Sequence, residues 1–160
     1  KGLFGVPTFF VDGVMYWGQD RMHQVEEAIT GLRISKPERK EWAPGTKVDF
    51  YFDYSSPFSY LGASRVSSIL GPDVHWKPML LGGLFKSIGT PNVPLFESSE
   101  AKRKYIFTDC YRGALQADVP FNWPSRFPMN TVLPLRVTIL AGGGNTPESQ
   151  KLLHKIPQLE

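Results

Sequence analysis

The feature that most constrains the fold is a strand that runs directly into a Ser-Pro helix start. Hydrophobic residues alternate along residues 48–54, as in a strand with one buried face. Ser56 is placed as the N-cap of the following helix and Pro57 at its first position, where proline is favoured. After this helix, residues 74–80 are predicted to form a second strand, which Gly82-Gly83 ends. The sequence therefore predicts a βαβ unit with parallel strands, and an α/β fold.

The segment before this unit is predicted to form a hairpin and a helix. Two β-rich runs flank Asp12-Gly13, a dipeptide typical of tight turns in which both central residues have positive φ. Asp20 is placed to cap a helix and Gly31 to end it. Charged and helix-breaking residues then fill positions 33–47, a composition typical of a linker. The predicted order is ββα, linker, βαβ.

The remainder of the chain is predicted to be helical with loops. Cys110 falls at helical spacing with Ile106 and Ala114, which favours a small buried residue over a nucleophile. The predicted features are a helix capped by Ser98 or Ser99, an aromatic and proline loop over residues 121–128, a helix capped by Asn130 and stopped by Gly142-Gly143-Gly144, and a short last helix from Thr146-Pro147-Glu148.

The composition excludes several classes of function. A single cysteine excludes an intrachain disulfide framework, a dithiol redox pair and a multi-cysteine zinc site. His23, His75 and His154 form no metal-ligand grouping, so we predict no metal site. A net charge of +3 gives no dense basic face for nucleic acid. No apolar run reaches the roughly 20 residues of a transmembrane helix, so we expect no membrane partner either.

Ser56 is the first candidate functional residue, because it lies where a predicted strand is followed by a predicted helix. Unpaired backbone N–H groups and the positive end of the helix dipole meet there and favour an anion. A hydroxyl at this point can donate a hydrogen bond to a bound thiolate and lower the pKa of the thiol, since the bond favours the charged form. The alternative is that Ser56 only caps its helix.

Gly5-Val6-Pro7-Thr8 is the second candidate. If the Val6–Pro7 bond before the strand is cis, the backbone of Val6 is free of the strand ladder. Its N–H and C=O can then pair with an extended peptide ligand as a short added strand. The alternative is a trans proline, the commoner isomer, at a strand start.

Two groups of motifs together resemble a known family. The first group is Ser56-Pro57-Phe58-Ser59-Tyr60-Leu61, Asn92 and Met129-Asn130-Thr131, and the second is Phe4-Gly5-Val6-Pro7-Thr8-Phe9 and Tyr16-Trp17-Gly18-Gln19-Asp20-Arg21-Met22. Through them, residues 47–141 resemble the first half of 2-hydroxychromene-2-carboxylate isomerases, and residues 1–34 resemble the second half. These isomerases belong with kappa-class glutathione transferases in the DsbA-like thioredoxin superfamily. The resemblance implies an α/β, thioredoxin-like fold with a helical insertion.

The halves of this fold stand in permuted order. In the family βαβ comes first, then a helical insertion, then ββα. We therefore expect residues 1–34 to be the C-terminal ββα part of one unit, residues 35–46 a linker, and residues 47–160 the N-terminal βαβ part and the start of the helical insertion of a second unit in a tandem fusion. A circular permutant that folds as one thioredoxin core is the alternative. A homodimer, or pairing between the tandem units, is compatible with this order.

The resemblance also implies a glutathione site. Ser56 matches the serine that hydrogen-bonds the sulfur of glutathione, the expected cofactor. Val6, next to Pro7, matches the residue whose backbone pairs with the cysteinyl part of the tripeptide. The other matches are Gln19 and Asp20 for the γ-glutamyl end, Asn92 for the groove wall and Lys102 for the glycine carboxylate. The plain alternatives are a helix cap for Asp20, a turn residue for Asn92 and a surface lysine for Lys102.

The implied function is a glutathione-dependent isomerase of the 2-hydroxychromene-2-carboxylate isomerase type, or a kappa-class transferase. The thiolate would add reversibly to a small aromatic electrophile, the expected substrate. A non-catalytic thioredoxin-like binding or scaffold module is the alternative. Disulfide oxidoreductase activity is disfavoured, because Ser56 and Ser59 stand where such enzymes carry Cys-x-x-Cys.

We expect a cytoplasmic location, with an organelle as the alternative. Candidates to line the substrate pocket are Tyr54, Phe58, Phe121 and Trp123.

Overall fold

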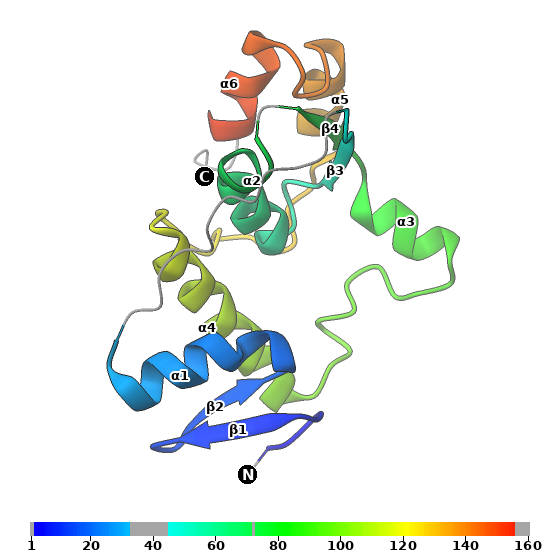
Figure 1. Ribbon diagram of the computed structural model, residues 1–160. Coiled ribbons are helices and arrows are strands. Elements are labelled where there is room, and N and C mark those ends of the chain that lie inside the picture. The colour runs from blue at the N-terminus through cyan, green and yellow to red at the C-terminus, as the bar shows by residue number, and fades with distance from the viewer. Residues whose placement is uncertain (1, 33–44, 72, 156–160) are drawn as a thin grey trace.

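The computed structural model describes residues 2–32, 45–71 and 73–155 (Figure 1). Residues 35–44 of the expected linker and residues 156–160 lie outside these ranges. The order of elements is the mixed α/β order that the sequence predicts, with a 3-10 helix and α3 in addition: β1 (Thr8–Val11), β2 (Val14–Trp17), a 3-10 helix (Gln19–Arg21), α1 (Met22–Thr30), β3 (Val48–Phe52), α2 (Pro57–Leu70), β4 (Val74–Pro78), α3 (Leu81–Ser87), α4 (Glu100–Ala117), α5 (Val132–Leu140) and α6 (Pro147–Lys155).

The first segment is the predicted hairpin followed by a helix. Strands β1 and β2 pair antiparallel with Val11 opposite Val14. Asp12 and Gly13 between them have φ of 48° and 81°, which confirms the tight turn. Gly31 ends α1 in the left-handed conformation, as its sequence position predicts.

The prediction that Asp20 caps α1 is wrong. Arg21 occupies the N-cap position of α1, and no side chain caps the helix there. Asp20 lies inside the preceding 3-10 helix, and its carboxylate instead pairs with the Arg21 guanidinium. The Asp20 carboxylate therefore binds the neighbouring Arg21 guanidinium instead of the backbone N–H groups at the start of α1.

The second segment is the predicted βαβ unit. Strands β3 and β4 pair parallel, with Phe50 opposite Trp76, and α2 joins them. Ser56 caps α2: its Oγ accepts a hydrogen bond from the Ser59 backbone N–H at 3.2 Å, and Pro57 is the first helical residue. Phe52 and Trp76 are buried in the core together with Val66, Val74, Leu135 and Leu153.

Two boundaries differ from the prediction. The second strand of the βαβ unit ends at Pro78, before Gly82-Gly83, and both glycines lie within α3, a helix that was not predicted. The N-cap of α5 is Thr131 rather than Asn130, although the Asn130 Oδ1 accepts a hydrogen bond from the Val132 N–H at 3.2 Å. Ser99 caps α4, as one of the two alternatives predicts. The other confirmed features are the glycine stop after α5 and the start of α6 at Pro147.

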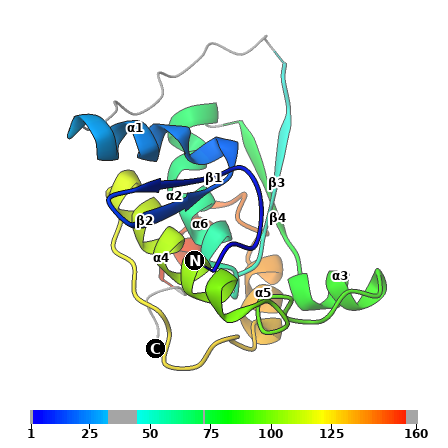
Figure 2. The same cartoon turned by 90° about the horizontal axis from the view of Figure 1, so that it is seen from below.

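The two segments pack together without sharing a sheet. Among the described residues, β1 pairs with β2 and β3 pairs with β4, and the two pairs remain separate sheets. The hairpin, α1 and α4 lie at one end of the molecule, while β3 and β4 lie with α2, α5 and α6 at the other (Figure 1). Seen from below, the hairpin lies in front of α2 (Figure 2). Helix α3 projects to the side, and the chain returns from it to α4 (Figure 1). Contacts between the two ends therefore come from side chains.

Candidate functional site

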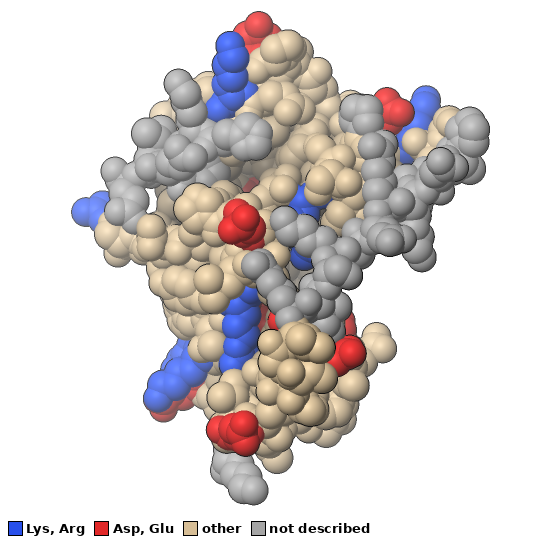
Figure 3. Space-filling model, turned by 60° about the vertical axis from the view of Figure 1, so that its left-hand side comes forward, with Lys and Arg blue, Asp and Glu red and all other residues tan. Residues whose placement is uncertain are grey.

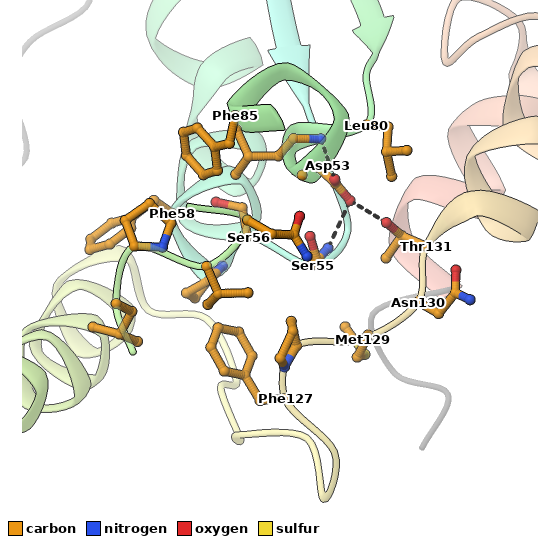
Figure 4. Close-up of a pocket in the computed structure, with 18 of the residues that line it drawn as sticks. Asp53, Ser55, Ser56, Phe58, Leu80, Phe85, Phe127, Met129, Asn130 and Thr131 are labelled. Carbon is orange, nitrogen blue, oxygen red and sulfur yellow. Dashed lines mark hydrogen bonds between the residues drawn. The ribbon is translucent and has the colours of Figure 1, made fainter. Parts of the chain in front are cut away.

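A cavity of about 570 Å³ opens at the N-terminus of α2. This volume is in the range of pockets that hold small molecules, roughly 300–1,000 Å³. Its walls come from the turn after β3, from α3 and the segment after it, from α4, and from residues 127–132 (Figure 4). Ser56, Asn92 and Lys102 line it, so the structure brings these three predicted site residues together.

The Ser56 side chain is half-buried and already makes one hydrogen bond. Its oxygen accepts from the Ser59 N–H, which uses one of the two acceptor positions of the hydroxyl. Accepting a bond leaves the hydroxyl proton available to donate to a ligand atom. The plain alternative, a capping role, is therefore correct and does not compete with a role in binding.

Asp53 forms a hydrogen-bonded centre beneath this cavity. Its side chain is buried, and its Oδ1 accepts from the Thr131 hydroxyl at 2.6 Å and from the Ser55 N–H at 3.0 Å. Its Oδ2 accepts from the Leu81 N–H at 2.7 Å (Figure 4). Asp53 is not among the site residues predicted from the sequence. The available signal was an acidic residue directly after a buried strand, because a buried charge requires hydrogen-bonding partners.

A second hollow of about 360 Å³ adjoins the cavity, since Phe58 and Ile106 line both. The other four predicted site residues line this hollow: Val6, Pro7, Gln19 and Asp20. The Val6–Pro7 bond is cis, which confirms the rarer of the two alternatives, and Val6 is 91% exposed. All seven predicted site residues thus line one or the other of two adjoining hollows.

Lys102 lies between the two hollows. It lines the larger one, and its Nζ lies 5.4 Å from the ring centroid of Trp17, which lines the smaller one. A cation at this distance from an indole is attracted by the negative face of the ring. Lys102 is half-buried, so it differs from the fully solvated surface lysine of the plain alternative.

A cluster of Arg21, Asp109 and Tyr105 joins the first segment to α4. The Arg21 guanidinium donates from Nε and Nη2 to the two Asp109 oxygens at 2.9 and 2.8 Å. The Tyr105 hydroxyl accepts from the Trp17 N–H at 3.0 Å. The hydrogen bonds to Asp109 raise the pKa of Arg21 above its usual value, and burial raises the pKa of Tyr105. This cluster holds the smaller hollow against α4.

Two of the predicted pocket aromatics lie elsewhere. Phe58 and Trp123 line the larger cavity. Tyr54 instead packs on Phe52, and its hydroxyl is 2.7 Å from the Thr138 hydroxyl. Phe121 packs edge-on against Tyr111 and Trp123 beside the cavity. Both belong to packing clusters, which is the plain alternative for such residues.

The remaining titratable residues form no further site among the described residues. Cys110 is fully buried, and burial raises its pKa to about 12, so it is not a nucleophile at neutral pH. His75 is exposed opposite Asp49, and His23 contacts Gln116, while the side chain of His154 lies outside the described part. Within that part we find no group of His, Cys, Asp and Glu suited to a metal ion.

The described surface carries charges of both signs. Basic and acidic side chains are interspersed on the face shown in Figure 3. None of the helices in the described ranges is long and apolar enough to cross a membrane.

Fold and site together define a class of protein: a thioredoxin-like α/β domain with a ligand-sized cavity at the start of the helix in its βαβ unit. The chain belongs to the DSBA-like thioredoxin family, whose domain model matches residues 1–30 and 47–155. This confirms the fold class and the superfamily that the motifs of the sequence indicate.

Two curated proteins are similar to parts of the chain. Glutathione S-transferase kappa 2 of Caenorhabditis elegans is 29% identical over 100 residues, which are 58% of this chain and 44% of that protein. The 2-hydroxychromene-2-carboxylate isomerase of Pseudomonas putida is 31% identical over 83 residues, 50% of this chain and 40% of that protein. The chain thus spans less than half the length of either relative. A search of the solved structures found no significant match.

Proposed function

We propose that this chain is part of a glutathione-dependent isomerase or transferase, in which Ser56 stabilises the thiolate of glutathione. The observation that carries the proposal is that the hollow lined by Ser56 adjoins the hollow lined by Val6, with Phe58 and Ile106 in the walls of both. Both curated relatives are enzymes by name, and one name includes glutathione. In its more specific form, the proposal is that the enzyme is an isomerase, as the sequence resemblance implies.

The residues around the two hollows fit the parts of a tripeptide thiol. The Ser56 hydroxyl, at the N-terminus of α2, donates to the sulfur while the helix dipole favours its negative charge. The backbone of Val6, a residue that is 91% exposed, pairs with the cysteinyl part. Gln19 and Asp20 bind the γ-glutamyl end, with Arg21 beside Asp20, and Lys102 meets a carboxylate.

The larger cavity has room and walls for an apolar substrate. Phe58, Trp123 and Phe127 contribute aromatic side chains to its wall. Such walls exclude water and favour a small aromatic electrophile. Bound glutathione supplies a thiol nucleophile to this space. The protein then contributes the orientation of the two reactants and the hydroxyl that stabilises negative charge on sulfur.

Replacement of Ser56 by alanine tests this role directly. Losing one hydrogen bond to a charged atom raises the thiol pKa of bound glutathione by about 1–2 units and weakens binding, because the bond favours the thiolate. Calorimetric titration and the ultraviolet absorbance of the thiolate measure the two quantities in the intact parent protein. Ser68→Ala, on an exposed part of the same helix, serves as the matched control.

The outcomes separate the two candidate functions. Unchanged affinity and unchanged thiol pKa in Ser56→Ala remove this residue from the mechanism. Conversion of an aromatic enone in the presence of glutathione distinguishes an enzyme from a non-catalytic binding module, which binds without turnover.

A pair of adjacent glycines tests the role of Asn92. A β-carbon at Gly82 would overlap the Asn92 side-chain oxygen, whereas one at Gly83 would meet Leu80 at an ordinary 3.4 Å. Both lie in α3, where alanine is the better helix former. We therefore expect Gly82→Ala to displace Asn92 and weaken glutathione binding several-fold, with no loss of thermal stability. Equal glutathione affinities of Gly82→Ala and Gly83→Ala would show that Asn92 does not contribute.

We also propose that the two segments are halves of successive units in a tandem fusion, as the permuted order implies. The separate β1–β2 and β3–β4 sheets support this account over a circular permutant with one joined sheet. In this account the adjoining hollows are formed by pairing between the two half-units. The full reading frame is expected to encode a strand and a Ser-Pro-x-Ser-like motif before residue 1 and a Gly-Val-Pro-Thr-like motif after residue 160. A reading frame that lacks both favours the permutant.

A further inference from the structure

We propose that Asp53 is a positioning residue. Its carboxylate binds three segments of the cavity wall and so fixes the position of the Ser56 hydroxyl relative to them. The inference rests on the proposed function, since it concerns how the Ser56 hydroxyl is placed against a bound thiolate. The residue touches neither reactant in this account. It acts through the groups that it binds.

The three donors to Asp53 come from parts of the chain that are far apart. Ser55 is two residues away, Leu81 is 28 residues away and Thr131 is 78 residues away. Leu81 is the first residue of α3, and Thr131 is the N-cap of α5. One carboxylate therefore ties the turn before α2 to the starts of two other helices, all of which line the cavity.

The backbone of Asp53 holds the same turn from the other side. Its carbonyl oxygen accepts from the Ser56 N–H at 3.0 Å, and its N–H donates to the Ser59 Oγ at 3.3 Å. Ser59 in turn donates its N–H to the Ser56 Oγ at 3.2 Å. The orientation of the Ser56 hydroxyl thus depends on a turn that Asp53 binds through both side chain and backbone.

The environment of the carboxylate argues for placement rather than proton transfer. Asp53 is only 2% exposed, and three donors occupy its two oxygens. Burial of a carboxylate is tolerated when such bonds replace its hydration. Loss of one donor leaves a buried charge with too few partners, so the segments shift to restore its hydrogen bonds.

Thr131 allows a test that leaves Asp53 in place. Thr131→Val removes the 2.6 Å hydrogen bond at nearly constant side-chain volume, and Thr131→Ser retains the hydroxyl. We expect Thr131→Val to bind glutathione about tenfold more weakly and to raise its thiol pKa, as for a lost hydrogen bond to a charged group. Thr131→Ser should behave as the wild type does. The Cys110 thiol does not disturb the measurement, because burial raises its pKa to about 12.

Thr138→Val is the matched control. Thr138 is also a fully buried threonine of this region, and its hydroxyl contacts the Tyr54 hydroxyl at 2.7 Å and the Pro134 carbonyl at 2.9 Å, not Asp53. A purely structural role predicts that both valine variants lose stability and leave the thiol pKa unchanged. A positioning role predicts that only Thr131→Val changes the thiol pKa.

Asp53→Asn gives an independent result with a defined sign. Removing a negative charge near a thiolate would by itself lower the thiol pKa and tighten binding. Weaker binding and a higher thiol pKa in this variant therefore report lost geometry and support the proposal. Tighter binding or a lower pKa overturns it, as do wild-type values in Thr131→Val. If the wild-type protein itself does not bind glutathione, the proposed function fails, and this inference fails with it.

Discussion

Replacing Asp109 with alanine is expected to lower the free energy of unfolding by about 2 kcal/mol, since it breaks a partly buried ion pair held by two hydrogen bonds. Asp109 is only 4% exposed and accepts two hydrogen bonds from the Arg21 guanidinium. In the variant the Arg21 guanidinium keeps its ion pair with the exposed Asp20 but loses the two hydrogen bonds to Asp109. Because Arg21 and Asp109 belong to different segments, the loss should also loosen the first segment from α4. Chemical denaturation measures the free energy, and hydrogen exchange of β1 and β2 measures the loosening.

The ion pair between Glu100 and Lys104 provides the control. Its atoms are 2.7 Å apart within α4, but both side chains are exposed. Exposed pairs of this kind contribute little, so Glu100→Ala should leave the unfolding midpoint essentially unchanged. Comparable destabilisation by the two variants would mean that the Arg21–Asp109 contact does not hold the segments together.

Cys110 is expected to react about a thousandfold more slowly with thiol reagents at pH 8 than an ordinary cysteine. Burial, and after it the nearby Asp109 carboxylate, raises its pKa from 9.0 to about 12, which lowers the fraction of thiolate by that factor. The thiolate fraction increases as the pH rises toward 12. The rate of labelling by a chromogenic disulfide should therefore increase with pH, about tenfold for each unit.

Unfolding removes the cause of this protection. In denaturant the same thiol should react at the rate of a model peptide, because both the burial and the neighbouring charge are lost. Complete labelling of the native protein within the mixing time at pH 8 would contradict the buried placement of Cys110.

Local rules were sufficient to predict most of the secondary structure. The Asp12-Gly13 turn, the Ser56 cap of α2 and the Gly31 end of α1 each follow from interactions within four residues. The same rules were wrong for Asp20, because the neighbouring Arg21 competes for its carboxylate. The same rules also missed α3, because two adjacent glycines, Gly82 and Gly83, are typical of a position where a helix or strand ends.

The site was predictable only in part. Ser56 and the Val6–Pro7 segment carry local signals, and the family resemblance indicated their chemistry. Asp53 carries almost none, because two of its three donors are 28 and 78 residues away and leave no periodic pattern. The position of the two hollows side by side, with Phe58 and Ile106 in the walls of both, could likewise not be predicted from the sequence.

The sequence by itself determined most of the elements, all but the 3-10 helix and α3, and the residues that cap α2 and end α1, because these depend on backbone preferences and hydrogen bonds between near neighbours. The tertiary structure alone decided that the hairpin packs on α4, that Arg21 binds Asp109 across 88 residues, and that one buried carboxylate supports the wall beside Ser56. Such contacts depend on which distant segments meet, and each partner in them is an ordinary residue until the fold brings the two together.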